Sequence, residues 1–569
     1  QGLSLKQELA DSLKEITRPL DSNADANTHF ACRFPARALF IKKHYGVPLA
    51  FELEKCSNFW AFKSKIDLDG VALVFSSYYI NNPGSAFGHT LLRLKRREGG
   101  GQDLLDYGVN YAALMTTENH ILYALYGILG GFQGNFSMTP YFFKIREYND
   151  MESRDLWEYE VNFSREELDF LVAHLWELDK AHFTYYYLRQ NCAYKILQLF
   201  DIVRPNLNLV DKLGYFVIPV DTIHDLFKVP DLVSRVSWRP SQQQKVKSRL
   251  RSLSYRQKKI VLHLIDKLRE KTFSRELLMT ALKPWTVPEQ VAVLDALIDA
   301  TDYLYPKQLL LGKGQDVSLA EKMKMLILHE RSQLASVAYQ APVIPSPVSP
   351  HLGLPTRRMA IGGSDSKKHG PAMDFAYRFA LQDPLELSEG HAPHTELEMG
   401  HFFLRYLQQS RRLYLHDGRI VSVISKKPWD EMEKPWSWML RFGAKDLVDT
   451  EVLEFAPYVT LGAGTTLGMF HEKLLFSLFL YTEESYSSKC ERSNARADLG
   501  VRPSLLFYLL PQITLQQEWT WARVLTKQKK WWRDSNFTLQ WTVNQHFGVQ
   551  AIYHYLGTDQ AQINLLRYF

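Results

Sequence analysis

The feature that most constrains the fold is a strict alternation of apolar and polar residues in the last third of the chain. Segment 536–545 reads NFTLQWTVNQ, and segment 512–525, QITLQQEWTWARVL, repeats the pattern. Successive side chains of a strand point to opposite faces, so each segment predicts a strand with one apolar face. About 195 residues follow Met373, which at roughly 16 to 18 residues per strand and turn predicts 10 to 12 antiparallel strands, enough to close a barrel.

Two β-architectures share this pattern and differ in where the apolar face points. A transmembrane barrel turns it toward lipid, whereas a soluble sandwich or lipocalin-like barrel turns it inward. Aromatic residues make up 13% of the chain, many lie in the alternating segments, and the chain ends on Phe569 as outer-membrane barrels often do. We therefore expect a transmembrane barrel over residues 373–569, with the soluble barrel or sandwich as the alternative.

Other membrane anchors and nucleic-acid binding are not expected. No window reaches the roughly 18 continuous apolar residues of a membrane helix; the nearest, residues 121–132, contains three glycines. The net charge of +6 comes with no dense basic tract, which argues against nucleic acid as a partner. The numbering opens on Gln1 rather than Met, so we expect a processed exported form or a shortened chain.

The texture of the chain divides it into five segments. Residues 341–355 hold five prolines in fifteen positions, which neither a helix nor a central strand tolerates. This boundary lies within a predicted linker. The expected order is a helical segment with two cysteines (1–66), a Cys/His domain (67–238), a helical domain (239–340), the linker (341–372) and the barrel (373–569).

Four cysteines are too few for a disulfide scaffold, and no CxxC pair indicates zinc. Cys32 and Cys56 enclose a short basic stretch, and in an exported protein a local disulfide between them is expected, with two buried thiols as the alternative. We expect no metal and no cofactor. The state of Cys490 stays open.

Cys192 lies in LRQNCAYKIL, where a loop is expected to become a helix. A thiol at a helix N-terminus experiences the positive end of the helix dipole, and the exposed N–H groups there can hold an oxyanion. Cys192 is therefore a candidate nucleophile, with Gln190 and Asn191 as positioning residues. The alternative is a small buried apolar residue.

His89 opens a predicted strand in NNPGSAFGHTLLRL, directly after Gly88 in a tight approach that also contains Pro83 and Gly84. A hairpin centred on REGGGQ pairs positions whose numbers sum to about 199, which sets His89 opposite Asn110. Asp106 lies on the same strand face, so either residue is a candidate to orient the imidazole. The order His, polar residue, Cys is a permuted papain-like arrangement in an α+β domain; a structural strand histidine is the alternative.

These residues carry a family resemblance. The run SSYYINNPGSAFGHTLLRL, then DYGVNY and RQNCAY, within about residues 68 to 205, resembles the Lnb N-terminal periplasmic domain family, distant relatives of permuted papain-like enzymes of the NlpC and lecithin:retinol acyltransferase type. The resemblance implies Cys192 as nucleophile, His89 as base and Asn110 or Asp106 as third member. It also implies a bacterial outer-membrane protein with its catalytic domain in the periplasm.

Three functions follow as expectations. The first is an outer-membrane-anchored thiol acyltransferase or acyl hydrolase that takes a fatty acyl group from a phospholipid or lipoprotein through a Cys192 thioester, as Lnb does within lipoproteins. The second is an NlpC-type peptidase or amidase acting on peptidoglycan. The third is a non-enzymatic pore or assembly factor. Membrane lipid is the expected partner, and the oligomeric state stays open.

Overall fold

The computed structural model describes residues 4–20, 24–50, 52–78, 87–97, 105–115, 117, 119–312, 317–334, 343–387, 391–446, 455–486, 495–526, 531–556 and 559–569. The chain divides into two compact units, residues 1–346 and 347–569. Each unit is described by itself. Cys490, Pro83 and Gly84 lie outside the described residues.

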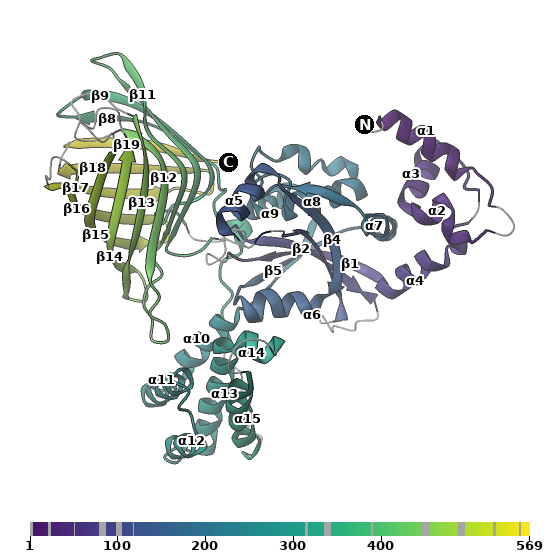
Figure 1. Ribbon diagram of the computed structural model, residues 1–569, viewed down its shortest axis with the longest axis horizontal. Helices are drawn as coiled ribbons and strands as arrows, with labels where there is room; N and C mark the ends of the chain where they lie inside the picture. Colours follow the sequence, from purple (N-terminus) through teal and green to yellow (C-terminus); the bar gives the residue numbers. More distant parts are fainter. Residues whose placement is uncertain are drawn as a thin grey trace. The chain divides into compact units, whose positions relative to one another are not determined.

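The first unit is built around a seven-stranded antiparallel sheet in the order β6-β4-β3-β2-β1-β5-β7 (Figure 1). The interior strand β1 is almost entirely buried, because helices lie against both faces of the sheet. The strands are β1 (Leu68–Ser76), β2 (His89–Arg96), β3 (Tyr107–Ala113), β4 (Phe132–Pro140), β5 (Leu156–Val161), β6 (His182–Tyr185) and β7 (Val233–Arg239).

Helices α7 and α8 pack on the sheet at β1, β2 and β3. A capping box between Ser164 and Glu167 starts α7 (Arg165–Leu178), as the sequence predicts. Helix α8 (Cys192–Val203) contacts α9 (Pro219–Phe227). The short α6 (Tyr141–Lys144) and the π-helix η6 (Ile145–Met151) cover the face that carries Val74 and Leu91. Helix α5 (His120–Leu129) precedes β4.

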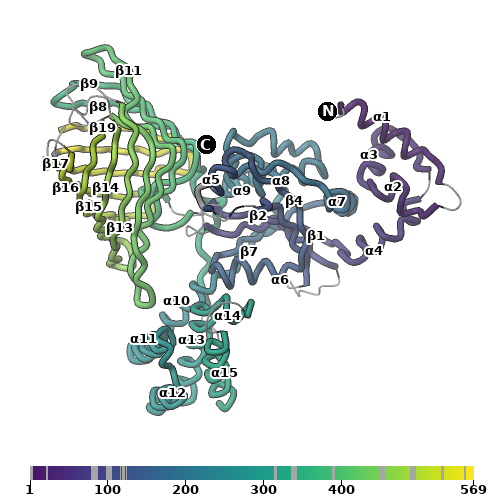
Figure 2. The backbone as a smooth tube through the Cα atoms, in the orientation of Figure 1, coloured from purple at the N-terminus to yellow at the C-terminus, as the bar shows by residue number. Residues whose placement is uncertain are grey.

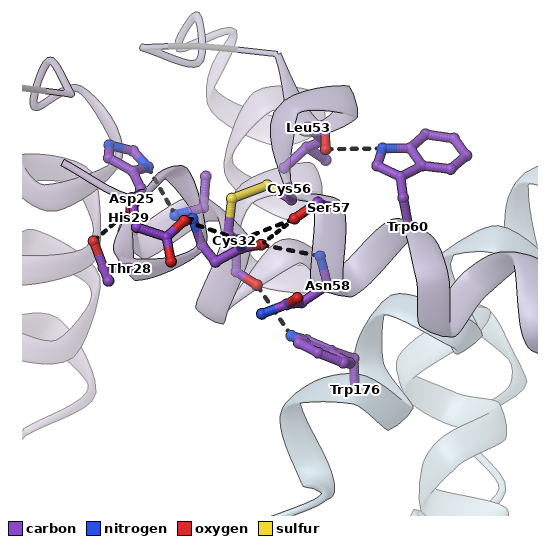
Figure 3. Close-up of a disulfide and its surroundings, with 12 residues drawn as sticks. Asp25, Thr28, His29, Cys32, Leu53, Cys56, Ser57, Asn58, Trp60 and Trp176 are labelled. Atoms are coloured by element: carbon purple, nitrogen blue, oxygen red, sulfur yellow. Dashed lines mark hydrogen bonds between the residues drawn. A yellow bond between two sulfur atoms is a disulfide. The ribbon is translucent and has the colours of Figure 1, made fainter. Parts of the chain in front are cut away.

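The N-terminal helices are tied by a disulfide between Cys32 and Cys56, the pairing that the sequence predicts (Figure 3). It joins the end of one short helix to the start of another. The indole of Trp176, on α7, donates a hydrogen bond of 3.0 Å to the carbonyl of Cys32 and so connects this segment to the sheet domain. The elements are α1 (Leu5–Ile16), η1 (Ala26–Thr28), α2 (Phe30–Arg33), α3 (Pro35–Tyr45), η2 (Leu53–Lys55) and α4 (Ser57–Ile66).

Further helices follow β7, in the range where the sequence predicts a helical domain. Arg146 of η6 donates to the carbonyl of Leu310 and so holds part of this bundle against the sheet domain. The helices are α10 (Gln242–Ser252), α11 (Tyr255–Arg269), α12 (Arg275–Leu282), α13 (Val287–Leu304), α14 (Pro306–Leu311) and α15 (Val317–Ser332), with η7 (Pro205–Leu207) and η8 (Val210–Lys212) before them. Among the described helices, none is both long enough and apolar enough to cross a membrane.

The second unit is a closed antiparallel barrel of 12 strands, within the predicted range of 10 to 12 (Figures 1 and 2). Consecutive strands pair, and β19 pairs with β8 to close the wall. The strands are β8 (Arg358–Ser366), β9 (Gly370–Gln382), β10 (Thr395–Leu407), β11 (Arg412–Ser425), β12 (Ser437–Asp446), β13 (Phe455–Met469), β14 (Leu474–Tyr486), β15 (Ala495–Leu510), β16 (Ile513–Val524), β17 (Trp531–Thr542), β18 (Phe547–Leu556) and β19 (Gln560–Tyr568), preceded by η9 (Pro350–Leu352).

The predicted linker of residues 341–372 is too long, because all of β8 and the start of β9 lie within it. The segment RMAIGGSDS contains two adjacent glycines, which weaken the alternating pattern by which a strand is recognised in the sequence. A Cβ atom on Gly362 would lie 2.1 Å from the carbonyl oxygen of Ile563 on β19. The pairing of β8 with β19 therefore leaves no room for a side chain at Gly362. As a result, the alternation of apolar and polar residues is interrupted in this strand.

The apolar face of the barrel points outward. On β19, Ile563 and Leu565 are more than 60% exposed, whereas Gln562 and Asn564 are buried in the interior. On β17, Trp541 is exposed and Gln540 is fully buried. A soluble barrel or sandwich would reverse this arrangement, so the wall is that of a transmembrane barrel.

Candidate active site

The site begins where β2 begins, at His89. Gly88, the preceding residue, has a φ of +78°, a conformation that side-chain-bearing residues rarely adopt. This backbone turn leads the chain into β2 and determines the position of the Cα atom of His89, from which the imidazole extends. The ring of Tyr148, from η6, lies against it with the ring centres 5.4 Å apart. Gly88 therefore positions the imidazole through the backbone.

Asn110 on β3 is the orienting residue of His89. Nε2 of His89 lies 2.6 Å from Oδ1 of Asn110. The strand pairing itself differs slightly from the prediction: Leu92 pairs with Val109, so partner numbers sum to 201 rather than about 199. A shift of two residues keeps the same side chains on the same face, so His89 and Asn110 still meet, as diagonal rather than direct neighbours.

Asp106, the alternative third member, is engaged elsewhere. Its carboxylate accepts hydrogen bonds from Nε of Arg93 at 2.8 Å and from the backbone N–H of Arg96 at 2.9 Å. Arg93 also pairs with Glu158, and all three charged side chains are buried. The candidate role of Asp106 at His89 is therefore wrong, because a buried arginine takes up this carboxylate.

Cys192 is the first residue of α8. Asn191 caps the helix: its Oδ1 accepts from the backbone N–H of Tyr194, and its Nδ2 donates to the carbonyls of Tyr187 and Val217. With its side chain fully used, Asn191 anchors the helix start and leaves the N–H groups of Cys192 and Ala193 without intrahelical acceptors. Gln190 is exposed and precedes the cap.

His89 and Thr90 are the neighbours that act on the Cys192 thiol. Burial alone would raise its pKa, but the charge of His89 and the polar effects of His89 and Thr90 outweigh it and lower the pKa of Cys192 to about 7. Since Nε2 of His89 is taken by Asn110, Nδ1 is the nitrogen left for the sulfur. Cys192 is only 3% exposed, and it is the only free cysteine among the described residues.

The pKa of His89 moves in the matching direction. Burial acts to lower it, but the charge of Cys192 and the hydrogen bonds that the imidazole donates to Cys192 and to Oδ1 of Asn110 raise the pKa of His89 above its usual value, against a smaller opposing effect of Arg154. A lowered thiol pKa beside a raised imidazole pKa favours a thiolate–imidazolium pair near neutral pH. Such a pair is a reactive nucleophile with an acid beside it.

Thr90 is a site residue that the sequence reasoning missed. It is fully buried, and within the described part of the chain its hydroxyl meets no hydrogen-bond partner. Thr90 nevertheless acts to lower the pKa of Cys192. Its place directly after His89 on the opposite strand face was the available signal. That signal is weak, because strands commonly carry threonine.

An aromatic wall adjoins the sulfur. Burial, together with the charge of Cys192, raises the pKa of Tyr111 to about 12, and the same two effects raise the pKa of Tyr185. The rings of Tyr111 and Tyr185 stack 5.5 Å apart, and Tyr187 meets Tyr185 at 5.7 Å. In the described residues no cluster of three or more His, Cys, Asp or Glu side chains could hold a metal ion. The aromatic rings thus form one side of the site.

Two family models match the chain. Residues 58–229 match the Lnb N-terminal periplasmic domain, and residues 347–568 match a domain of unknown function (DUF7840). The first range contains His89, Asn110 and Cys192, and the second contains the whole barrel. No match is found among curated proteins.

Solved outer-membrane proteins are similar to part of the chain. The NanC porin is 11% identical, covering 37% of this chain and 99% of its own, with a TM-score of 0.25. An outer membrane channel of Pseudomonas putida F1 is 13% identical, covering 42% and 100%, with a TM-score of 0.26. Omp33 of Acinetobacter baumannii is 10% identical, covering 38% and 99%, with a TM-score of 0.21.

The barrel's character rests on its own strands: a closed wall, an apolar outer face and a polar interior. The chain joins a domain that matches the Lnb N-terminal periplasmic domain to a closed 12-stranded barrel of the outer-membrane type, and it is an outer membrane protein with a periplasmic domain.

Proposed function

We propose that the protein is an outer-membrane-anchored thiol acyltransferase or acyl hydrolase that acts on phospholipids or lipoproteins. The observation that carries this proposal is that Asn110 orients His89, while the charge of His89 lowers the pKa of the Cys192 thiol to about 7. A buried structural cysteine would have its pKa raised instead. The site is therefore that of a nucleophile with its base and a positioning residue.

The proposed reaction has two halves. The Cys192 thiolate attacks the acyl carbonyl, a C–S bond forms, and the C–O bond to the donor alcohol breaks while His89 gives that alcohol a proton. His89, now neutral, then takes a proton from an incoming amine, hydroxyl or water, which attacks the thioester and releases the thiolate. Asn110 holds Nε2 of His89, so that Nδ1 serves both transfers.

The N-terminus of α8 supplies the proposed oxyanion donors. Because Asn191 accepts only the N–H of Tyr194, the N–H groups of Cys192 and Ala193 are available to the carbonyl oxygen as it gains charge. One lost donor of this type costs about 10²- to 10³-fold in rate in other acyl-transfer enzymes. Gln190, exposed beside the cap, is a further candidate donor.

Helix α5 favours a lipid over a peptide as substrate. Its residues Leu122, Leu125, Ile128 and Leu129 are 41 to 72% exposed, an unusual apolar surface for a ten-residue helix. The backbone N–H of Tyr187 donates to the carbonyl of Gly127 on α5, and Tyr187 leads through Tyr185 to Tyr111. An apolar path thus runs from this exposed helix toward Cys192.

The barrel interior argues against an open pore as the function. Glu386, from the connection between β9 and β10, pairs with Arg358 and Arg378 inside the wall. The same connection is held by Tyr508, whose hydroxyl donates to the carbonyl of Pro384, and by Gln540, which donates to that of Leu385. A segment pinned this way fills part of the lumen. We propose that the barrel serves as an anchor.

The test is intact-protein mass spectrometry after incubation of the full chain with phospholipid vesicles and with a diacylated lipoprotein. The expected result is a fatty-acyl mass increment that hydroxylamine removes and that Cys192→Ala and His89→Ala lack. Cys490→Ala is the matched thiol control and should keep the adduct. Cleavage of peptidoglycan fragments without any adduct would indicate a peptidase instead. If neither an adduct nor cleavage is found, the proposed enzymatic role is contradicted.

A further inference from the structure

The outer wall of the barrel carries an apolar groove of about 460 Å³ across β14, β15, β16 and β17. This volume lies in the range of small-ligand pockets, about 300 to 1,000 Å³. Its apolar lining consists of Phe470, Leu474, Leu505, Phe507, Leu515 and Phe537. The apolar outer face of the wall is hollowed at this place.

The groove lies near one rim of the barrel. Twelve strands that run alternately up and down bring both ends of the barrel chain to the same rim, and the turns 470–473 and 511–512 lie at that rim too. The periplasmic domain precedes the barrel in the chain, so the rim at which the first barrel strand begins faces the periplasm. The groove therefore opens toward the periplasmic leaflet of the membrane.

A lysine marks the rim end of the groove. Lys473 is exposed, and its carbonyl accepts a hydrogen bond of 2.8 Å from the N–H of Tyr508, which holds the turn in place. Phe470 in the same turn is 71% exposed. A lysine at this depth can lay its apolar stem along hydrocarbon and hold its ammonium group among lipid phosphates.

Gln517, one polar residue of the groove wall, is paired through its amide nitrogen. Gln517 points outward between apolar neighbours, and its amide donates to the hydroxyl of Ser535 at 2.9 Å and to that of Tyr555 at 3.3 Å. The indole of Trp519 donates to the same Tyr555 oxygen at 3.0 Å. Because its amide nitrogen is satisfied within the wall, Gln517 does not oppose the entry of an acyl chain.

We propose that this groove binds one acyl chain of a glycerophospholipid of the periplasmic leaflet, with the lipid phosphate held by Lys473. The apolar lining fits the chain, and the cation at the rim end of the groove fits the charge of the headgroup. The site belongs to the barrel alone and does not depend on the chemistry of Cys192.

The experiment uses the full-length protein in nanodiscs that contain phosphatidylglycerol with a photoactivatable diazirine in one acyl chain. After irradiation, adducts are mapped by peptide mass spectrometry. The expected result is enrichment on residues 470–474, 505–507 and 515–517 over the other lipid-facing strands. Lys473→Glu should lower this enrichment about fivefold, and Leu515→Trp, which fills the groove, should remove it.

Two matched variants separate the site from general lipid contact. Lys434→Glu changes an exposed lysine in the connection between β11 and β12, at the same rim, and Leu565→Trp enlarges an exposed residue on β19. Both should leave the enrichment unchanged. If Leu515→Trp fails to fold, as its gel mobility without boiling would reveal, Lys473→Glu on the exposed turn decides alone.

Adducts spread evenly over the wall, or an enrichment that Lys473→Glu leaves intact, would overturn the proposal. The Cys192→Ala background should give the same adduct map as the unchanged chain. A failure of the proposed acyl chemistry would therefore leave this inference standing, and a failure of the groove would leave that chemistry standing.

Discussion

A Cβ atom on Gly88 would lie 2.6 Å from Cε2 of Phe75, across the pair of strands β1 and β2. Real Cβ atoms essentially never come so close, and Phe75 is fully buried and cannot move aside cheaply. The positive φ of Gly88 adds a second reason for glycine at this position. The entry of the chain into β2, and with it the place of His89, depends on this absent side chain.

Gly88→Ala is therefore expected to destabilise the first unit by about 2 to 3 kcal/mol, since the strain of a positive φ adds to the clash. Acylation should fall as His89 is displaced. Thermal unfolding and adduct formation would be measured together. Gly46→Ala is the matched control: its φ is +64°, but nothing lies within 4 Å of the added Cβ, so it should cost about 1 kcal/mol. Equal losses for the two variants would contradict the argument.

The alkylation of Cys192 should follow a thiol that titrates near pH 7. Below that pH the sulfur is protonated and slow to react, and above it the thiolate dominates, so iodoacetamide rates should rise through pH 7. His89→Ala removes the positive charge that lowers the pKa of Cys192, while burial of the thiol still raises it. The pH midpoint of the alkylation rate should therefore move upward to 9 or beyond. At pH 7 the rate should then fall about 50-fold, as the thiolate fraction does. An unchanged midpoint in His89→Ala would refute the coupling.

Asn110 and Asp106 should respond differently to substitution. Asn110→Ala frees the imidazole ring and should lower the rate of thioester formation by about 10- to 100-fold with little effect on stability. Asp106→Asn weakens the buried contacts with Arg93 and Arg96 and should cost about 1.5 to 3 kcal/mol. The acylation rate per folded molecule should remain. If instead Asp106→Asn lowers the acylation rate and Asn110→Ala lowers only the stability, Asp106 is the orienting residue.

Helix α5 should matter only when the substrate is in a membrane. Leu129→Glu puts a charge on the most exposed apolar residue of the helix and should lower acylation from vesicles about tenfold. Acylation from a soluble short-chain thioester should stay the same. Met325→Glu, at an exposed methionine of α15, is the comparison and should change neither rate. A loss with the soluble donor would point to a packing defect instead.

The disulfide should stabilise the N-terminal helices. Cys32 and Cys56 are separated by 24 positions, and closing a loop of this length contributes about 3 kcal/mol. The double variant Cys32→Ser/Cys56→Ser should therefore unfold its N-terminal segment at lower temperature, measured by limited proteolysis on heating. Reductant should reproduce the effect in the unchanged chain and add nothing in the double variant. Equal protease resistance in both would contradict a stabilising role.

Local sequence signals predicted the elements that depend on neighbouring residues. The capping box at Ser164 and Glu167 starts α7, and α8 begins at Cys192 directly after Asn191. The alternation predicted a barrel in the right range of strand number. Each of these signals acts over a few residues, because caps and strand periodicity are set by the chain's own geometry.

Features that depend on residues far apart in the sequence were predicted less accurately. The sequence predicts a linker where the first barrel strand lies, because the strand contains glycines. The space for a side chain at Gly362 is occupied by β19, some 200 residues later in the chain. The hairpin register was displaced by two residues, and Thr90 was not recognised beside the sulfur.

The sequence by itself determined that a cysteine begins a helix, that a histidine begins a strand after a glycine, and that the last 200 residues alternate with period two. The side chain that orients His89 is set by the fold, because the residue order allows both Asn110 and Asp106 and a buried arginine pairs with Asp106. The tertiary structure also decided the pKa of Cys192, since burial and the charge of His89 oppose each other and act only when the fold brings them together. Periodicity and capping are local properties of the chain, whereas partner choice and electrostatics arise from contacts between residues far apart in sequence.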